Sequence, residues 1–431
     1  MQRRVAVTGL GIVNPFGVAE SPEGSPARSS ASDFFQRVAA GESAISLYTT
    51  EDIPRPISIP AVRCAGFQPE KRLGKALSGM MERFAQLGVS AAFDAWEDAG
   101  FARTGEQTDR SGGSAGERGV AWGTALGGLM AFERGYRDFW QHGRERVAPM
   151  SVVLGMNNAA AAHISIQLGL GNSSLTYSVA CASAAAAIGE AFHHIRRGGA
   201  KVMLAGGSDA TLAYAVVRAW EALKVLAPGD EASARTACKP FHPARAGLVL
   251  GEGAAALVLE DWDHAVARNA RIYAEIAGYG ANADHVHLVR PDQTGQVAAI
   301  QMALNEAGLL PAEIGYVNAH GTATREGDPI EISALRAVFG PHAEQLAVSA
   351  TKSAHGHLMG ATGAVEALLT VLALHHDTLP PTAHLDEVDA GCAGVAHVRG
   401  SALRGSGVRA ALSNSFAFGG SNAVLAFKAA K

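Results

Sequence analysis

Cys181 stands where a predicted β-strand passes into a predicted helix. Residues 174–179 form a short β-type run, and an almost unbroken series of helix formers extends from Ala182 to Gly198–Gly199, which stops the helix. The first turn of a helix carries a partial positive charge, which favours a thiolate over a thiol. The position therefore suits a nucleophile, although a lone cysteine is also often a small buried apolar side chain.

The other side chains that could do chemistry lie in the second half of the chain, near the ends of predicted strands. His320 follows one strand directly, Lys352 follows another, and His357 comes five residues after Lys352, just before a helix. Phe418 lies in a glycine-rich loop between two strands. A histidine in a turn is by itself most often structural, but strand ends in α/β sheets are where functional sites concentrate. One cysteine, two histidines and a lysine in such places form a set suited to acyl transfer.

The elements that must hold these residues alternate between strand and helix twice along the chain. In the first half, the predicted strands are 4–8, 120–123, 174–179, 201–210 and 254–259, and the predicted helices are 33–40, 79–99, 151–170, 182–197 and 262–269. In the second half, the predicted strands are 271–278, 314–319, 346–349, 394–399 and 408–413, and the predicted helices are 296–307, 328–338 and 360–375. Strands of parallel type in this order predict an α/β architecture of two similar halves, residues 1–262 and 263–431, with sheets sandwiched between helices. The polar segments 20–32 and 103–118 are predicted to be surface loops.

Composition and charge indicate an ordinary globular protein. Of the 431 residues, 48% are hydrophobic and 50 are glycine, and the formal net charge of −4 is not typical of nucleic-acid binding. The four cysteines show no CxxC pairing, so the pattern indicates neither a disulfide framework nor a zinc site. The first strand leaves no room for a signal peptide, and no apolar run approaches transmembrane length. We therefore expect a cytoplasmic protein without a membrane partner.

Four segments carry a resemblance to a known family: SVACASAAAAIG, YVNAHGTAT with the following GD, TKSAHGHLMGATGAVEA and NSFAFGGSN. Together they resemble the condensing enzymes of the β-ketoacyl-acyl-carrier-protein synthase family, KAS I/II type, and the likeness runs nearly from end to end. It implies the thiolase fold, a five-layered αβαβα duplication. It also implies decarboxylative condensation of malonyl-carrier protein with an acyl chain, in fatty-acid or type II polyketide biosynthesis.

The resemblance also implies roles for individual residues and for partners. The implied roles are the acylated nucleophile for Cys181, catalysis for His320, His357 and Lys352, gating for Phe418, contact with the phosphopantetheine arm for Thr322 and Thr324, and closure of the acyl pocket for Leu126. The backbone N–H groups of Cys181 and Phe418 would bind the oxyanion. The implied partners are acyl carrier protein and either a second copy or a chain-length partner subunit. No metal or redox cofactor is implied.

Several positions depart from the family pattern. Ala417 replaces a glycine beside Phe418, which should restrict the gating loop. Arg325 stands where relatives usually have proline, and the nearest basic cluster for an acidic carrier protein is Lys71, Arg72 and Lys75. These departures favour a specialised pathway, such as an aryl polyene or another type II polyketide, over housekeeping fatty-acid elongation.

Two other functions compete with this interpretation. A thiolase-like acyltransferase that works without decarboxylation would need a second active-site cysteine, for which Cys392 is the candidate in the C-terminal half. A non-catalytic chain-length partner subunit would lack the nucleophile, and the presence of Cys181 argues against it.

Overall fold

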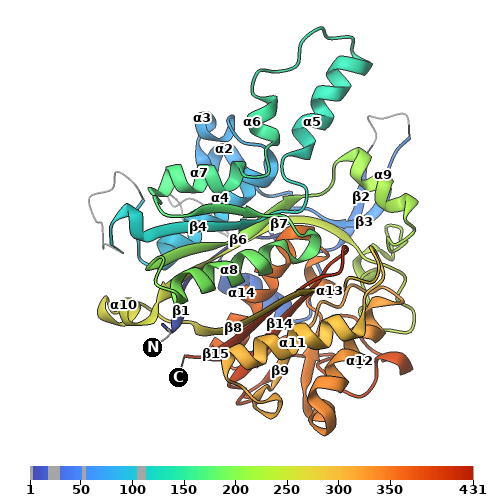
Figure 1. Cartoon of the computed structure of the whole chain (residues 1–431). Coiled ribbons are helices and arrows are strands. Elements are labelled where there is room, and N and C mark those ends of the chain that lie inside the picture. Colours follow the sequence, from blue (N-terminus) through green and yellow to red (C-terminus); the bar gives the residue numbers. More distant parts are fainter. Residues whose placement is uncertain (1–2, 18–29, 51–54, 104–112, 431) are drawn as a thin grey trace.

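Two half-sheets of the same strand order form the framework of the molecule. The computed structural model describes residues 3–17, 30–50, 55–103 and 113–430 (Figure 1). The first half-sheet has the order β5 (Ser174–Tyr177), β4 (Arg118–Gly123), β6 (Val202–Ala210), β7 (Leu250–Asp261), β1 (Val5–Val13). The second has the order β10 (Ala347–Ser349), β9 (Tyr316–Asn318), β14 (Ala410–Phe416), β15 (Ser421–Ala429), β8 (Ala274–Ala283), with β12 (Ala396–His397) beside β10. The three strands named first in each half-sheet run parallel and the remaining two pair antiparallel, so the halves repeat one topology.

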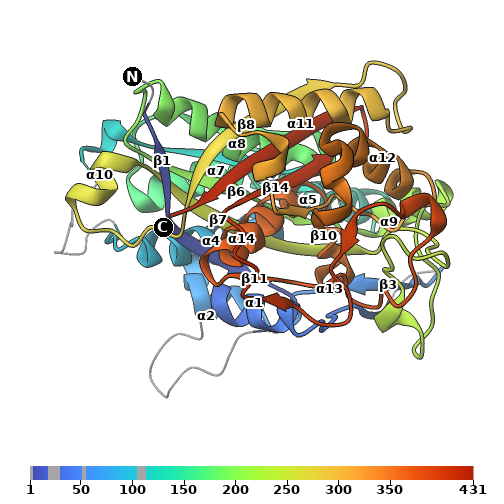
Figure 2. The same cartoon turned by 90° about the horizontal axis from the view of Figure 1, so that it is seen from below.

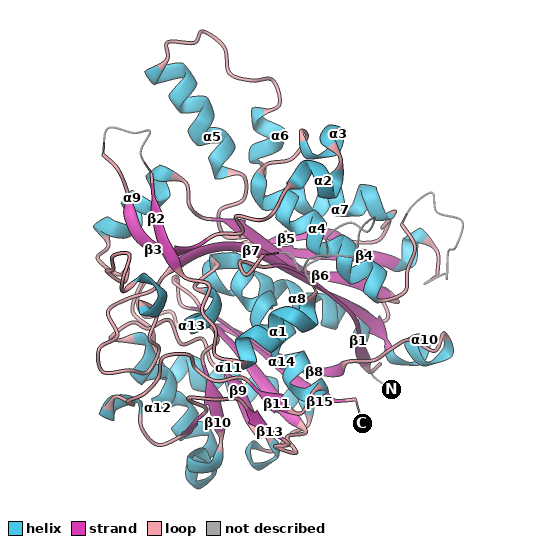
Figure 3. Cartoon of the chain, turned by 180° about the vertical axis from the view of Figure 1, so that it is seen from behind, coloured by secondary structure: helices cyan, strands magenta, loops and turns pink. Residues whose placement is uncertain are grey.

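Helices cover both half-sheets and fill the space between them. The outer helices are α4 (Arg83–Asp98) and α7 (Ala159–Leu168) on the first half-sheet, and α11 (Gln293–Ala307) and α12 (Gly327–Phe339) on the second (Figure 3). The inner helices are α8 (Ser183–Arg196) and α14 (Thr362–His375), which contact strands of both half-sheets. Seen from below, α14 lies between α11 on one side and α1 (Ala31–Ala39) on the other (Figure 2). This arrangement of five layers confirms the predicted α/β duplication.

The inner helices owe their position to side chains that are apolar or small on all sides. Residues Thr362–Leu374 of α14 are all buried, as expected of a helix enclosed by protein. A Cβ atom on Gly123 would lie 2.3 Å from the backbone nitrogen of Ala184, so β4 and α8 approach each other as closely as glycine and alanine allow. The alanine-rich run after Cys181 is therefore what lets this helix lie between two sheets.

Shorter elements complete the chain. They are β2 (Ser46–Thr49), β3 (Ser58–Val62), α2 (Pro69–Leu73), α3 (Lys75–Ser78), α5 (Leu129–Tyr136), α6 (Ser151–Gly155), α9 (Tyr214–Ala222), α10 (Trp262–Ala267), α13 (Lys352–His355), β11 (Thr378–Leu379), β13 (Leu403–Arg404) and the 3₁₀ turns η3 (Ala180–Ala182) and η7 (Met359–Ala361). Helix α5, the π-helical turn η2 (Arg137–Gln141) that follows it, and α6 together form an arm that projects from the body (Figure 1). In the described part of the chain, no helix combines the length and the apolar character needed to cross a bilayer.

Three expectations from the sequence need correction or lie outside the structure. The helix predicted over 151–170 is wrong: it is broken into α6 and α7 because Met156 is extended and the ring of Phe132 packs against Gly155. The alternation of elements did not predict the antiparallel strands of each half. Most of the predicted loops 20–32 and 103–118 lies outside the described residues. The domain boundary at residue 262 stays a prediction.

Candidate active site

Three turns from distant parts of the chain bring Cys181, His320 and His357 together. Cys181 lies in η3 between β5 and α8, His320 follows β9, and His357 follows α13. The cysteine sulfur and one nitrogen of each imidazole lie within 4.8 Å of one another, and all three side chains are buried. The two imidazole rings meet edge to face, with 5.6 Å between their centroids.

Each of these turns contains a residue other than glycine with a positive φ angle. The residues are Ala180 (49°) before Cys181, Ala323 (62°) after His320, and Met359 (48°) after His357. Such a conformation costs about 1–3 kcal/mol and persists only where the surroundings impose it. Beside Cys181 they do: the hydroxyl of Ser183 accepts a hydrogen bond from the N–H of Val179 and donates one to the carbonyl of Ala180.

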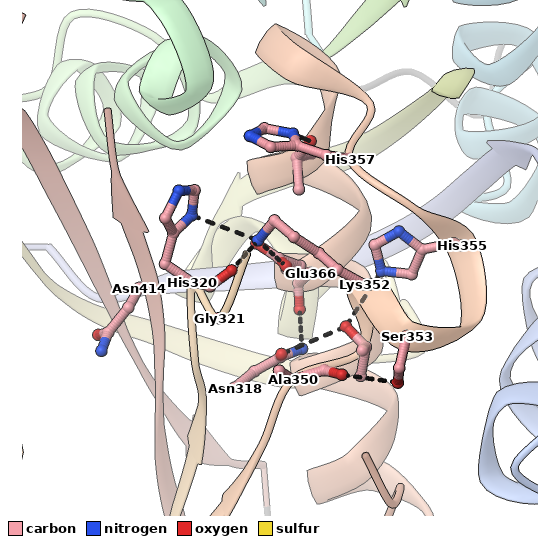
Figure 4. Close-up of polar contacts among 12 residues, drawn as sticks. Asn318, His320, Gly321, Ala350, Lys352, Ser353, His355, His357, Glu366 and Asn414 are labelled. Carbon is pink, nitrogen blue, oxygen red and sulfur yellow. Dashed lines mark hydrogen bonds and ion pairs between the residues drawn. The ribbon is translucent and has the colours of Figure 1, made fainter. Parts of the chain in front are cut away.

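Hydrogen bonds determine which nitrogen of each histidine carries the proton. The ammonium of Lys352 lies 3.3 Å from Nδ1 of His320, which must therefore accept, leaving the proton on Nε2 (Figure 4). Nδ1 of His357 accepts from the backbone N–H of Met359 at 3.1 Å, so its proton is also on Nε2. Both histidines thus present an Nε2–H donor.

Burial keeps these two histidines neutral. It lowers the pKa of His320 and of His357 well below the usual range, and the positive charge of Lys352 lowers both further. Two neutral imidazoles can donate to an oxygen that becomes negative during a reaction.

A fully buried ion pair supports the histidines from behind. Nζ of Lys352 lies 2.5 Å from Oε1 of Glu366 and also donates to the backbone carbonyl of His320 (Figure 4). Glu331 accepts the N–H groups of His320 and Gly321, both at 2.8 Å, and so holds the turn after β9. Neither glutamate was predicted from the sequence, although Glu366 could have been noticed as the one carboxylate in the otherwise apolar α14.

Replacing Lys352 with methionine is expected to lower the free energy of unfolding by about 1–3 kcal/mol, because the buried carboxyl of Glu366, whose pKa burial raises to about 8, would lose its hydrogen-bond donor. Equilibrium denaturation of the two proteins measures the difference. The double variant Lys352→Met/Glu366→Leu removes both charges and should recover most of the loss. A Lys352→Met protein as stable as the native one would contradict the pairing.

The position of Cys181 at the start of helix α8 was expected to favour a thiolate, but burial outweighs this influence in the free protein. Burial raises the pKa of Cys181 to about 11, against the opposing influence of Lys352 and of the backbone N–H groups of Phe418 and Cys181. Desolvation of a thiolate outweighs the field of the helix here. The thiol must therefore lose its proton as it reacts.

A cavity of about 570 Å³ opens onto these residues from the surface. The predicted site residues that line it are Cys181, His320, His357, Thr322, Thr324 and Phe418. Phe418 is half-buried and its ring stacks on that of Trp220 in α9, with 5.7 Å between centroids. Cys64, Cys238 and Cys392 are also buried, but within the described chain Cys181 is the only cysteine that lines this cavity.

Two predicted residues lie apart from the cavity. Lys352 is behind His320, and Leu126 is half-buried in the turn after β4. This turn is held by Asp209, whose carboxylate accepts the backbone N–H groups of Ala125, Leu126 and Gly360. Burial raises the pKa of Asp209 to about 6. Asp209 thus links the turn that carries Leu126 to the turn after His357, a connection that was not predicted from the sequence.

The predicted basic cluster needs a correction. Arg72 forms an ion pair with Asp94 of α4, and its side chain is only 9% exposed, so it is not available on the surface. Lys71 and Lys75 are exposed. Three further exposed basic residues line the cavity, Lys224, Arg290 and Arg325, and of these only Arg325 was singled out in the sequence.

The same three side chains could in principle bind a metal ion, because cysteine and histidine are zinc ligands. The buried ammonium of Lys352 beside the histidines opposes a second positive charge at this place. The arrangement is better suited to a nucleophile with two hydrogen-bond donors.

Comparison with known proteins agrees with this geometry. The model of the N-terminal domain of beta-ketoacyl synthases matches residues 2–265, and that of the C-terminal domain matches residues 273–386. The chain is 39% identical to nodulation protein E of Rhizobium sp. (strain N33), covering 99% of this chain and 100% of that one. It is 35% identical to 3-oxoacyl-[acyl-carrier-protein] synthase 2 of Staphylococcus aureus (strain N315), covering 99% and 98%.

Solved structures show the same likeness over whole chains. The ishigamide ketosynthase/chain length factor superposes with a TM-score of 0.88 at 29% identity, and coverage is 100% of both chains. A type II polyketide ketosynthase complex with its acyl-carrier protein (AntDE:AntF) gives a TM-score of 0.85 at 27% identity, again with 100% coverage of both chains. With both family models matched and full-length relatives above a third identity, the chain belongs to the beta-ketoacyl synthase family of condensing acyltransferases.

Proposed function

We propose that Cys181 carries the acyl chain and that His320 and His357 promote decarboxylation of a malonyl thioester, which then attacks that chain. The observation that carries the proposal is the meeting of one thiol and two Nε2–H donors in a single cavity. Substrates arrive on the phosphopantetheine arm of an acyl carrier protein. This chemistry needs no metal or redox cofactor.

Acylation of Cys181 comes first. The sulfur attacks the carbonyl carbon of the acyl thioester, the bond from that carbon to the carrier sulfur breaks, and the proton of Cys181 leaves with the carrier thiol. The negative oxygen of the tetrahedral intermediate accepts from the backbone N–H groups of Cys181 and Phe418. Support comes from the influence that these two N–H groups already exert on the thiol, whose pKa they lower against burial.

Condensation follows when malonyl-carrier protein occupies the cavity. The bond to the carboxylate breaks, CO2 leaves, and the electron pair forms an enolate whose oxygen accepts from Nε2–H of His320 and His357. The enolate carbon bonds to the acyl carbonyl carbon, the bond to Cys181 breaks, and the thiolate takes up one proton. Lys352 acts as a positioning residue that fixes His320.

The remaining predicted residues fit roles in binding the carrier arm and in gating the cavity. Thr322 and Thr324 line the cavity with their hydroxyl oxygens 3.1 Å apart, where they would contact the carrier arm. Phe418, stacked on Trp220, would act as the gate.

The arm of α5 and α6 exposes a set of large apolar side chains, Phe132, Tyr136, Phe139, Trp140, Met150, Val152 and Met156, which fits burial against a second subunit. The edge strand β5 also exposes an apolar side chain, that of Leu175.

The proposed pathway is a specialised one in the cytoplasm. Relatives at similar identity include a nodulation protein and a 3-oxoacyl-[acyl-carrier-protein] synthase, so identity alone does not separate the pathways. The departures at Arg325 and Ala417 favour type II polyketide or aryl polyene synthesis, and the ishigamide neighbour is a ketosynthase with a chain length factor. A heterodimer of that kind is the proposed alternative to a homodimer.

The competing functions fit the geometry less well. Cys392 lies in a separate 3₁₀ turn and does not line the cavity, so a thiolase-like reaction finds no second thiol beside Cys181. Reconstitution with acyl- and malonyl-carrier protein separates the classes. Equal amounts of CO2 and 3-oxoacyl product support condensation, product without CO2 indicates the thiolase-like reaction, and neither product nor CO2 indicates a non-catalytic subunit.

Changing Leu126 is expected to change product length. Leu126→Phe adds volume to the proposed end of the acyl pocket and should shorten the products, whereas Leu126→Ala should lengthen them. The product profile by mass spectrometry is the measurement, with Ile166→Ala on the exposed face of α7 as a control that should not alter it. Identical profiles for both Leu126 variants would contradict the pocket assignment.

Carrier binding is expected to weaken as salt rises, because acyl carrier proteins are acidic and Lys71 and Lys75 are exposed. The affinity should fall several-fold between about 50 and about 500 mM salt, and Lys71→Ala/Lys75→Ala should reduce that dependence. Arg72→Ala would disturb the ion pair with Asp94 and is therefore not a clean test. Salt-independent affinity would rule out docking through this patch.

A further inference from the structure

An aromatic side chain from another part of the chain holds the ring of Phe418. Trp220, in the last turn of α9, stacks on Phe418 with 5.7 Å between the ring centroids and 26° between the ring planes. Both side chains are half-buried and line the cavity. Stacked aromatic rings at this separation attract each other beyond the apolar area that they bury. The place of the Phe418 ring therefore depends on α9.

Two glycines follow Phe418 in the turn between β14 and β15. Gly419 and Gly420 have positive φ angles of 88° and 73°, and a Cβ atom on Gly419 would meet nothing within 4 Å. The N–H of Gly419 donates to the carbonyl of Leu288 at 2.7 Å, but Leu288 is itself 74% exposed. Glycine restricts the backbone less than any other residue, so a side-chain contact can decide where the neighbouring ring lies.

Helix α9 is a firm support for this contact. Val216 and Val217 are buried, which fixes one face of the helix against the body. Its first two N–H groups donate to the carboxylate of Glu133, in α5, at 3.3 and 3.0 Å. These bonds satisfy donors that the first turn of a helix otherwise leaves free. Trp220 thus extends from a helix that is anchored at its start and along its side.

Phe418 also brings its backbone N–H to the nucleophile. Burial raises the pKa of Cys181, and the N–H of Phe418 is among the groups that oppose this rise, as expected of a donor beside the sulfur. In the proposed function this N–H binds the oxyanion, and such a donor is effective only if it stays directed at the oxygen. The ring and the N–H belong to one residue, so a contact that fixes the ring also restricts the backbone that directs the donor.

We propose that Trp220 is a positioning residue for acyl transfer, which holds Phe418 so that its backbone N–H stays directed at the oxyanion. The inference rests on the proposed function, because it requires acylation of Cys181 and binding of the oxyanion by that N–H. Trp220 acts through Phe418 and is therefore not itself a catalytic residue. It should matter for acyl transfer and not for decarboxylation, whose oxyanion is bound by the two histidines.

Trp220→Leu, which removes the ring and keeps an apolar side chain, is expected to slow acylation of Cys181 by about two- to tenfold. The release of CO2 from malonyl-carrier protein in the absence of an acyl donor should stay unchanged. Single-turnover acylation at saturating acyl-carrier protein, followed by intact-protein mass spectrometry, gives the first rate, and labelled CO2 gives the second. Trp220→Phe keeps a ring and should restore most of the acylation rate.

Leu223→Ala is the matched control, because Leu223 directly follows α9, is a large exposed apolar residue and lines the same cavity. It should leave the ratio of the two rates unchanged. If Trp220→Leu does not fold, Trp220→Met replaces it. An unchanged ratio in Trp220→Leu, whether both rates persist or both fall, or an equal change of the ratio in Leu223→Ala, would overturn the inference. Absence of acylation at Cys181 in the native protein would instead overturn the proposed function.

Discussion

Cys181→Ala is expected to abolish the acyl-enzyme and to lower condensation by at least about 10³-fold, because alanine has no thiol to form the thioester that holds the chain. Cys181 is the one cysteine that lines this space within the described chain, and it lies beside both Nε2–H donors. Incubation with acyl-carrier protein, followed by peptide mass mapping, measures the label. The native protein should carry one acyl group, on the peptide that contains Cys181.

The other cysteines provide the control. All are buried, and burial raises the pKa of Cys238 and Cys392 to about 12 and that of Cys64 well above the usual value. Cys238→Ala and Cys392→Ala should therefore label as the native protein does. A transferred acyl group on any other cysteine in Cys181→Ala would show that the nucleophile is misassigned.

Separate assays of acyl transfer and decarboxylation are expected to reveal the role of His320 and His357. His320→Ala and His357→Ala should each slow decarboxylation of malonyl-carrier protein by about 10²–10³-fold, since the enolate oxygen loses one of two donors. Acyl transfer to Cys181 should continue in both variants, because its oxyanion is bound by backbone N–H groups. Release of labelled CO2 and acyl labelling of the protein give the two rates independently.

His355 is the matched control for this experiment. It is a buried histidine two residues before His357, but its Nε2 contacts the hydroxyl of Thr351 and it does not line the cavity. His355→Asn should leave the ratio of the two half-reactions unchanged. Normal CO2 release by both His320→Ala and His357→Ala would remove the proposed role from them.

The pH dependence follows from the direction of the pKa shifts. His320 and His357 have pKa values held well below the usual range, so each remains neutral above that lowered value and gains charge only below it. Decarboxylation should therefore not decline through histidine protonation as the pH falls from about 8 to about 6. Asp209, which holds the turn after His357, has a pKa raised to about 6, so Asp209→Asn is measured beside the native protein. A loss of activity centred near the ordinary imidazole pKa in both proteins would contradict the buried, neutral state.

Local patterns in the sequence determined the architecture and the identity of the reactive groups. Alternating strands and helices predicted the two α/β halves, and the alanine run after Cys181 predicted a helix that can be enclosed. These features depend on neighbours in sequence, through hydrophobic periodicity, helix termination at glycine and the lack of bulk near residue 184. The same local patterns predicted that His320, Lys352 and His357 lie near the ends of strands.

The protonation states depended on the tertiary structure. Whether Cys181 is a thiol or a thiolate depends on its burial in the folded protein, which raises its pKa to about 11 and outweighs the influence of its position at the start of α8. The tautomers of the histidines depend on contacts with Lys352 and Met359. The ion pair between Lys352 and Glu366 connects the start of α13 to the interior of α14. No spacing along the chain shows such contacts.

The tertiary structure also decided which charged side chains are accessible at the surface. Arg72 belongs to a basic run in the sequence, yet Asp94 pairs with it and removes it from the surface. Residue types and their order therefore determined what chemistry this protein has, whereas burial and long-range pairing decided which groups are charged, which are occupied, and which are free to meet a substrate.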